Sequence, residues 1–510
     1  MRGCVFGGLA ALAAALVPVA GAKAADAPVV KVDAGALQGV AADGVASFKG
    51  VPFAKPPVGM WRWRPPQRPD GWNGVRPATA YGAICMQPTV PGDNGVGSGP
   101  VSEDCLTLNV FTPRTDPSAH AAPLPVMVWI HGGGLVNGSG TAALYDGTHL
   151  AQQGVVVVTI NYRLGRFGFF AHPALTAETP KTYLGNYGLM DQIAALQWVK
   201  RNIAVFGGDP GNVTIFGESA GGYSVDRLML IRQARGLFHK AISQSGAYKD
   251  PNLTLAAAEQ EGVAFARRMG VAGDDPAALR ALPAAAIVAA DDLSEASDWG
   301  APILDGRLLT EDARSGFGRG RSARVPYLIG SNSLELHLDP ESPRFAKLIK
   351  QTPDEIAALV TAYGSQAAFD LHAPTDVAFA EPARALARDH AISGSPTYLY
   401  RFAVLSAGAP ASLKGAPHAS DRQYVFDTLK ASPWPTDERD ETLAKTISAY
   451  WVAFARTGDP NGDGRPHWPA YNSRDQLMDF TNDGPIAKAT SDAPVLDLIA
   501  ERYRQTPSPR

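Results

Sequence analysis

Short runs of β-branched and other apolar residues recur along the chain, and longer segments with a helical spacing of apolar residues lie between them. A short apolar run predicts a buried strand, whereas apolar residues three or four positions apart predict one face of a helix. The predicted strands cover residues 126–130, 155–160, 213–216, 241–245, 325–330 and 398–402. Helical spacing covers residues 191–206 and 443–454. Strands that alternate with helices predict an α/β fold with a mostly parallel central sheet.

The helix predicted over residues 443–454 has start and stop signals as well as a periodic face. Asp437 and Glu438 make its first turn acidic, and Gly458 follows as a stop signal. An alanine-rich segment, residues 253–292, is also helical in composition and is expected to pack above or beside the sheet. No linker divides the chain, so residues 25–510 are predicted to form one large domain with insertions.

The N-terminus has the pattern of a secretory signal peptide. Residues 3–22 carry no charge, Arg2 precedes them, and a small-residue site ending at Ala24 follows. The alternative is an uncleaved membrane anchor, because about 20 apolar residues can span a bilayer. Four glycines and Pro18 within the run, and the small-residue site after it, favour cleavage. Residues 1–24 are therefore predicted to be removed from a secreted or periplasmic protein that has no stable membrane insertion.

The cysteines fit export to an oxidising compartment. The chain has three, and Cys4 lies in the predicted signal peptide, so Cys85 and Cys105 remain. An even number suggests one disulfide, which would close a loop of 19 intervening residues. The chain-entropy model gives such a bridge about 3 kcal/mol of stabilisation. The alternative is two free thiols.

Composition then excludes some classes of protein. The chain has 510 residues, of which 45% are hydrophobic and 19% are charged, a composition too apolar for a disordered protein. Lys and Arg, 46 in total, do not outnumber the 49 Asp and Glu. This balance argues against a nucleic-acid partner.

A G-x-S-x-G motif occurs once, at residues 217–221, directly after the predicted strand 213–216. Between a strand and a helix-compatible stretch, the motif predicts a nucleophile elbow, a tight turn whose glycines avoid clashes that a Cβ would cause. The Ser219 hydroxyl would then project at the carboxyl end of the sheet. The alternative is a structural Gly-Ser turn. Glu218 is interpreted as a supporting acid or as packing at the helix start, without a role in proton transfer.

A run of three glycines, residues 132–134, follows the predicted strand 126–130. Backbone N–H groups of glycine can approach a ligand without obstruction by a side chain. The N–H groups of Gly133 and Gly134, with that of Ala220, are predicted to bind the oxyanion that forms when a serine attacks a carbonyl. The alternative is a simple glycine turn.

The acid and the base should follow the serine in the order serine, acid, histidine. His418 lies in a polar loop after the predicted strand 398–402, a suitable place for a catalytic base. Glu335 follows the predicted strand 325–330 and is the favoured acid, which would hold the histidine tautomer and stabilise the imidazolium. The alternatives are His337, His372, His390 and His467 for the base, and Asp305 and Asp339 for the acid.

Two long segments resemble the signatures of a known family. Residues 206–222, which contain Ser219, are similar to the active-site signature of the type-B carboxylesterase/cholinesterase family, and residues 103–113 are similar to its second signature. Further similar segments are residues 48–57, 161–165, 185–192 and 457–461. The resemblance covers nearly the whole chain after the predicted signal peptide.

This resemblance implies an α/β-hydrolase fold and hydrolysis of carboxylic esters, with a small-molecule ester as substrate and no cofactor. The resemblance implies that Ser219 is the nucleophile, Glu335 the acid and His418 the histidine. These are the same three residues that the local patterns favour. It also matches Cys85 and Cys105 to the first disulfide of the family.

Departures from the family pattern bear on the substrate more than on the chemistry. Gly and then Glu usually follow the family histidine, whereas residues 419–421 are Ala, Ser and Asp. Residues 86–104 contain no Phe, Tyr or Trp, so a cation–π site for a quaternary ammonium group has no platform in that loop. Leu135 stands where an aromatic residue often follows the glycines. These departures argue against a choline esterase and leave open a lipase or a specialised detoxifying or polyester esterase.

Two further classes are disfavoured. Non-catalytic binding members of the family lack the serine, whereas Ser219, Glu335 and His418 are all present here. Residues 459–464 resemble the start of an EF-hand loop, but its twelfth position is Ala470 rather than Glu, so no metal site is expected.

Overall fold

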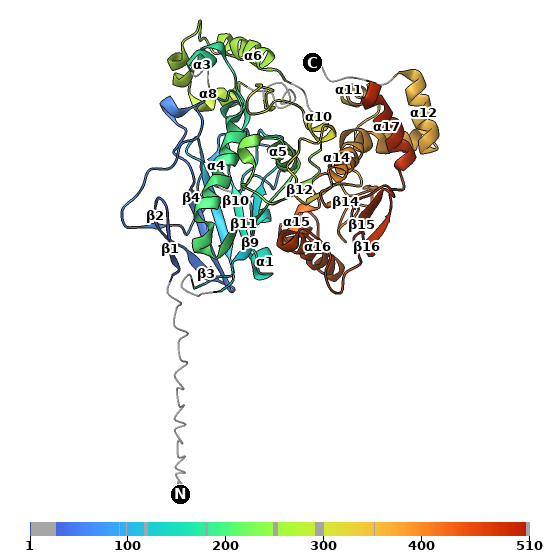
Figure 1. Ribbon diagram of the computed structural model, residues 1–510, viewed down its shortest axis with the longest axis horizontal. Helices are drawn as coiled ribbons and strands as arrows, with labels where there is room; N and C mark the ends of the chain where they lie inside the picture. Colours follow the sequence, from blue (N-terminus) through green and yellow to red (C-terminus); the bar gives the residue numbers. More distant parts are fainter. Residues whose placement is uncertain are drawn as a thin grey trace.

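The main structural element is an eleven-stranded mixed sheet (Figure 1). The computed structural model describes residue 1 and residues 27–505, apart from 91, 98, 117–120, 179–181, 248–252, 291–299 and 351. The strands of the sheet are β3 (Val40–Ala42), β4 (Val45–Pro52), β8 (Thr107–Thr112), β9 (Leu124–Ile130), β10 (Val156–Ile160), β11 (Gly208–Glu218), β12 (Lys240–Gln244), β13 (Tyr327–Asn332), β14 (Thr397–Phe402), β15 (Gln476–Thr481) and β16 (Gly484–Ala489). Their spatial order is β16-β15-β14-β13-β12-β11-β9-β10-β8-β4-β3.

The centre of the sheet is parallel. All pairs from β10 through β9, β11, β12, β13 and β14 to β15 are parallel. The strands β3, β4 and β8 at one end, and β16 at the other, pair antiparallel. Each of the six predicted strands corresponds to one of the parallel strands β9 to β14, so the predicted α/β fold is confirmed.

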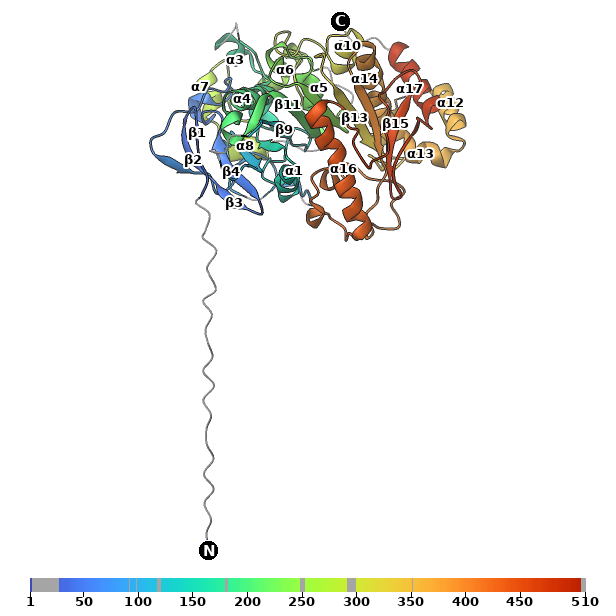
Figure 2. The ribbon, with the colours of Figure 1, turned by 60° about the horizontal axis from the view of Figure 1, so that its bottom comes forward.

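The strands β9 and β10 are almost entirely apolar because both faces of the sheet are covered. Side chains of a strand alternate between the two faces. In β9, Val126, Val128 and Ile130 belong to one core, which also contains residues of the helix α4 (Tyr187–Asn202). Met127 and Trp129 belong to the core on the other face, beneath the helix α16 (Glu438–Thr457), which lies across the sheet in Figure 2.

The helices flank the sheet and form its connections (Figures 1 and 2). Before β13 they are α1 (Thr148–Gln152), α2 (Gly165–Gly168), α3 (Pro173–Glu178), α4, α5 (Ala220–Leu228), α6 (Leu255–Arg268), α7 (Pro276–Ala281), α8 (Ala284–Ala289) and α10 (Ala313–Gly318). After β13 they are α11 (Pro343–Ile349), α12 (Pro353–Tyr363), α13 (Gln366–Thr375), α14 (Glu381–Ile392), α15 (Arg422–Val425), α16 and α17 (Ala493–Gln505). Short 3₁₀ turns complete the connections.

The predicted helices form with shifted boundaries. The helix predicted over residues 191–206 begins earlier, as α4, and its last part is a 3₁₀ turn, Ile203–Phe206, which ends at Gly207 with φ 81°. Around α16, Asp437 forms a capping box with Asp440, and Gly458 terminates the helix with φ 83°, as the sequence predicts. The described part of the alanine-rich segment forms α6, α7 and α8.

Two small sheets and a helical cluster extend this core. One small sheet contains β1 (Val29–Val32), β2 (Gly35–Gln38) and β5 (Val75–Pro77), and the other contains β6 (Ile84–Cys85) and β7 (Val101–Ser102). The helices α11, α12, α13 and α17 pack on one another around Phe345, Leu359 and Phe369 at the edge of the molecule (Figure 1). No helix among the described residues is long and apolar enough to cross a membrane. The predicted signal peptide, Met1 excepted, lies outside the described residues.

Candidate active site

Ser219 lies at the turn between β11 and α5, in a backbone conformation that few non-glycine residues adopt. Its φ is 55° and its ψ is −123°. The flanking glycines explain why the turn is possible, since a Cβ on Gly217 would lie 2.5 Å from the backbone of Gly221. A Cβ on Gly221 would in turn meet the carbonyl of Ile130 in β9. The turn therefore requires glycine at both positions, as the motif predicts.

The structure brings Ser219, His418 and Glu335 into one chain of hydrogen bonds. The Ser219 hydroxyl lies 2.8 Å from Nε2 of His418, and Nδ1 of the same ring lies 2.7 Å from Oε2 of Glu335. With Nδ1 protonated, the ring donates to the Glu335 carboxylate and its Nε2 accepts the serine proton. Ser219 follows β11, Glu335 follows β13 and His418 follows β14, so the three side chains meet at the carboxyl ends of parallel strands.

Two of the alternatives that the sequence left open, His390 and Asp305, are hydrogen-bonded elsewhere. His390 is buried in α14 and bonds to Ser322 and to the carbonyl of Val325. Asp305 accepts backbone hydrogen bonds from its own turn, including that of Leu309. Both side chains are thus held by bonds to other segments of the chain.

The loops that carry Glu335 and His418 are joined by several hydrogen bonds. Asn332 donates from its side chain to the carbonyl of Pro417 at 2.7 Å, and its backbone N–H donates to Oε1 of Glu335 at 2.7 Å. The Leu334 N–H donates to the Ala416 carbonyl. The candidate acid and the candidate base are thus held in register by direct bonds between residues more than 80 positions apart in the sequence.

The glycine run lies beside the serine, where the sequence predicts an oxyanion site. Gly133 and Gly134 have φ values of 100° and 62°, in the region that favours glycine. A Cβ on Gly132 would lie 3.1 Å from Cβ of Ser219, so this loop approaches the nucleophile closely. Ala220 is the first residue of α5, and its N–H has no carbonyl of its own helix to bind.

Glu218, interpreted from the sequence as a supporting acid or as packing at the helix start, contacts the candidate base. Its side chain is buried, and Oε1 lies 3.4 Å from Nε2 of His418. Burial raises the pKa of Glu218 to about 7. Burial by itself would lower the pKa of His418, but Glu218 and Glu335 outweigh it and raise that pKa to about 9. The imidazole therefore lies between two carboxylates, one at each ring nitrogen.

The segment after His418, where the chain departs from the family pattern, has a definite structure. Ala419 has φ 66°, a left-handed conformation that favours glycine and costs an alanine about 1 kcal/mol. Asp421 is buried and accepts hydrogen bonds from Gln244 at 2.7 Å and from the Tyr400 hydroxyl at 3.3 Å. Burial raises the pKa of Asp421. This carboxyl anchors the histidine loop to β12 and β14.

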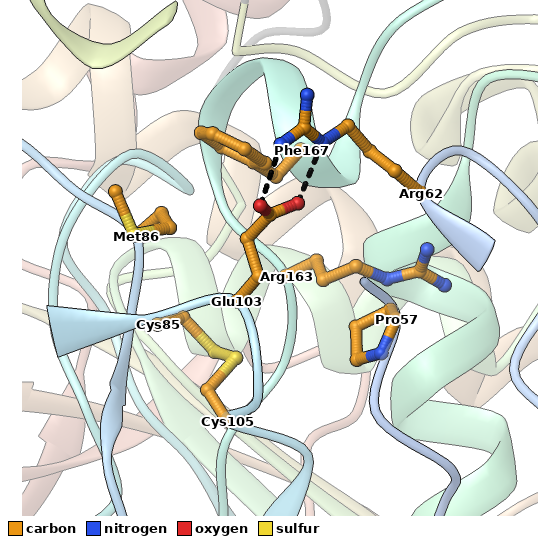
Figure 3. Close-up of a pocket in the computed structure, with 8 residues that line it drawn as sticks. All are labelled: Pro57, Arg62, Cys85, Met86, Glu103, Cys105, Arg163 and Phe167. Atoms are coloured by element: carbon orange, nitrogen blue, oxygen red, sulfur yellow. Dashed lines mark hydrogen bonds and ion pairs between the residues drawn. A yellow bond between two sulfur atoms is a disulfide. The ribbon is translucent and has the colours of Figure 1, made fainter. Parts of the chain in front are cut away.

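Cys85 and Cys105 form a disulfide, as predicted (Figure 3). Beside it, Arg62 makes a bidentate ion pair with Glu103, both at 2.6 Å. These residues line a small cavity together with Pro57, Met86, Arg163 and Phe167. Neither this cavity nor a second one beside α6 is lined by Ser219, Glu335 or His418.

Replacing both cysteines by alanine is expected to lower the free energy of unfolding by about 3 kcal/mol, because the unfolded chain loses a closed loop. Denaturant unfolding of the double variant beside the wild type measures this difference. Treatment of the wild type with a reducing agent should produce the same loss. A double variant as stable as the wild type would show that the Arg62–Glu103 pair and the surrounding core hold this loop without the bridge.

Comparison with known proteins agrees with this fold. A model of the carboxylesterase family matches residues 26–360 and 363–494. The chain is 38% identical to para-nitrobenzyl esterase of Bacillus subtilis, covering 87% of this chain and 92% of the relative. It is 36% identical to fumonisin B1 esterase of Sphingopyxis macrogoltabida, covering 92% and 89%, and 35% identical to liver carboxylesterase of Sus scrofa, covering 92% of each.

Solved structures give the same result. A para-nitrobenzyl esterase superposes with a TM-score of 0.80 at 34% identity, covering 92% of this chain and 99% of that one. A carboxylesterase of Geobacillus stearothermophilus has a TM-score of 0.80 at 33% identity, with the same coverage. The chain therefore has the α/β-hydrolase fold, belongs to the carboxylesterase family and is a carboxylic ester hydrolase.

Proposed function

We propose that this enzyme is an exported serine carboxylesterase in which Ser219, His418 and Glu335 form the catalytic triad. The observation that supports this most is the unbroken chain of hydrogen bonds from the Ser219 hydroxyl through His418 to Glu335. Such a chain activates a hydroxyl that is a weak nucleophile by itself. The strained turn at Ser219 and the adjacent glycine loop supply the other parts that ester hydrolysis needs.

In the proposed mechanism, Ser219 attacks the ester carbonyl while His418 accepts its proton at Nε2. The N–H groups of Gly133, Gly134 and Ala220 bind the oxyanion of the tetrahedral intermediate. His418 then protonates the leaving alcohol, and an acyl group remains on Ser219. Water, deprotonated by the same histidine, attacks this acyl-enzyme and releases the carboxylic acid.

The leader and the disulfide support export. We propose that residues 1–24 are removed and that residues 25–510 form one α/β-hydrolase domain outside the cytoplasm. The Cys85–Cys105 disulfide is typical of proteins in oxidising compartments. Peptide mass mapping of the mature protein, recovered from a secreting host, should find a new N-terminus near Ala24.

Trapping on the serine tests the mechanism directly. An organophosphonate probe is expected to label Ser219, because only an activated serine attacks phosphorus at a useful rate. Mass spectrometry of a peptide that contains residues 206–222 locates the adduct. An unlabelled Ser219 in folded protein would contradict the triad and support a non-catalytic binding protein.

A second candidate function is that of a specialised esterase, which the similarity to fumonisin B1 esterase suggests. The lipase and the polyester esterase that the sequence left open belong to the same test. A panel of esters with graded acyl and alcohol sizes separates these possibilities. A general carboxylesterase is expected to prefer short acyl chains. A preference for long chains or for polymer would identify the specialised class.

The pH dependence of hydrolysis should change when Glu218 is replaced by glutamine. A base must be unprotonated, so the raised pKa of His418, about 9, places the acid limb of kcat/KM at high pH. Glu218→Gln removes one of the two carboxylates that raise this pKa, and the limb is expected to move to lower pH. Profiles of kcat/KM from about pH 5 to pH 10 measure the shift. Identical limbs in the variant and the wild type would contradict the coupling of Glu218 to His418.

A further inference from the structure

Arg422 is a partly buried cation close to the candidate nucleophile. It begins α15, and its side chain is 13% exposed. Its Nε donates to the Ala419 carbonyl at 2.9 Å, and its Nη1 donates to the Tyr145 hydroxyl at 2.8 Å. Its Nη2 donates to Oδ1 of Asn94 at 3.2 Å. Three separate segments of the chain therefore fix the direction of this guanidinium.

The guanidinium of Arg422 lies beside the carboxylate of Glu218. Nε of Arg422 lies 3.8 Å from Oε2 of Glu218, while the other oxygen of this carboxylate, Oε1, faces Nε2 of His418 at 3.4 Å. Gly95 leaves room for this arrangement, since a Cβ there would lie 2.9 Å from Nη1 of Arg422. Glu218 is thus shared between the cation of Arg422 and the imidazole of His418.

Any ester that reacts on Ser219 must place its alcohol group near Glu218. In the proposed mechanism the leaving oxygen takes its proton from Nε2 of His418, the atom that Glu218 faces. A buried carboxylate without a compensating cation attracts positively charged groups strongly, because the surrounding dielectric is low. The net charge around the Glu218 carboxylate therefore affects which alcohol groups bind beside Nε2 of His418.

We propose that Arg422 determines the charge specificity for the alcohol part of the ester. By compensating the Glu218 carboxylate, it makes the site select uncharged alcohol groups and disfavour cationic ones. This inference rests on the proposed roles of Ser219 and His418. It agrees with the disulfide loop, residues 86–104, which contains no aromatic side chain to bind a quaternary ammonium group.

The other carboxylates around Arg422 are engaged by different partners. Asp93 accepts from the Asn137 side chain at 2.6 Å and from the Gly95 N–H at 2.7 Å. Asp421 accepts from Gln244 at 2.7 Å. Glu218 is the carboxylate that contacts both Arg422 and His418, and Arg422 therefore sets the charge beside the reacting atoms through Glu218.

The test compares two esters of nearly equal shape and different charge. These are acetylcholine and its uncharged analogue, 3,3-dimethylbutyl acetate. The ratio of kcat/KM for the cationic ester to that for the neutral ester is measured on the full-length enzyme at about pH 9, above the pKa of Glu218. Because the ratio cancels general losses of activity, it responds to charge at the site rather than to packing.

Arg422→Met is expected to raise this ratio about tenfold. This is the order of effect expected when one unit charge is removed a few ångströms from a charged substrate group in a partly screened site. Arg422→Lys keeps the charge and should leave the ratio near the wild-type value. Glu218→Gln leaves Arg422 uncompensated and should lower the ratio. If Arg422→Met does not fold, Arg422→Gln takes its place, because it also removes the charge but keeps a side-chain donor for the Tyr145 hydroxyl.

Three results would overturn the proposal: an unchanged ratio in Arg422→Met, an unchanged ratio in Glu218→Gln, or a wild-type enzyme that prefers the cationic ester. Failure of the proposed mechanism looks different. In that case Ser219→Ala would retain hydrolysis of the neutral ester, whatever the ratio in the Arg422 variants.

Discussion

Ser219→Ala is expected to lower kcat/KM for a short chromogenic ester by about 10⁴-fold to 10⁶-fold, the largest loss that any single substitution in this enzyme should cause. The substitution removes the hydroxyl that lies 2.8 Å from Nε2 of His418, and with it the atom on which the acyl group would form. The glycine loop would still bind the substrate carbonyl, so a small residual rate above that of water is expected. Steady-state kinetics with purified protein measure the loss.

Ser224→Ala, in the helix α5 that follows Ser219, provides a matched control. The Ser224 hydroxyl donates to the Ala220 carbonyl at 2.8 Å and accepts from Gln192, so its loss removes a buried hydroxyl without removing the nucleophile. Its activity should remain within about tenfold of the wild type, since a single buried hydrogen bond contributes about 1 kcal/mol. Hydrolysis by Ser219→Ala at the wild-type rate would refute the assignment of the nucleophile.

Glu335→Gln is expected to lower kcat about 10³-fold to 10⁴-fold. The carboxylate oxygen of Glu335 lies 2.7 Å from Nδ1 of His418 and accepts its proton. A glutamine can present its amide N–H₂ to Nδ1 instead, which favours the tautomer with the proton on Nε2 and removes the acceptor for the serine proton. The charge that stabilises the imidazolium is lost as well. Single-turnover kinetics separate this loss from any change in substrate binding.

Asp339→Asn tests the specificity of that effect. Asp339 is the nearest of the alternative acids in the sequence, and its carboxylate accepts the N–H of Glu341 at an exposed turn. Activity is expected to stay close to the wild-type value. A large loss in Asp339→Asn together with a normal rate in Glu335→Gln would transfer the role of the acid to Asp339.

Local patterns predict much of this fold because the central strands are buried on both faces. β9 and β10 therefore appear as uninterrupted apolar runs that are easy to find. Boundaries are less well predicted. β11 extends to Glu218, beyond the predicted 213–216, because its ladder with β12 continues to the residue before Ser219. The capping of α16 by Asp437 is a local interaction, which explains why its start was predictable.

The contacts that set the charge and the conformation around His418 were not predictable from local patterns. Glu218 and Arg422 are about 200 residues apart in the sequence, and only the topology of the sheet brings them within 3.8 Å. The sequence favoured Glu218 as a supporting acid or as helix-start packing, but gave no sign of its contact with Arg422. The Asp421 side chain likewise gains its role from Gln244 in β12. Chain order and polar loops predicted Glu335 and His418, which the structure places within hydrogen-bond distance of each other, but they did not predict that Glu218 faces Nε2 of His418.

The bonds between the acid loop and the histidine loop have a consequence for engineering. The Asn332 side chain donates a hydrogen bond to the Pro417 carbonyl, and the Leu334 N–H donates one to the Ala416 carbonyl. The conformation of each loop therefore depends on the other loop. A chimera in which only one of these loops comes from a relative would lose the hydrogen bonds between the two loops. Libraries that seek new substrates should therefore exchange residues 331–336 and 415–422 together, as one interchangeable cassette.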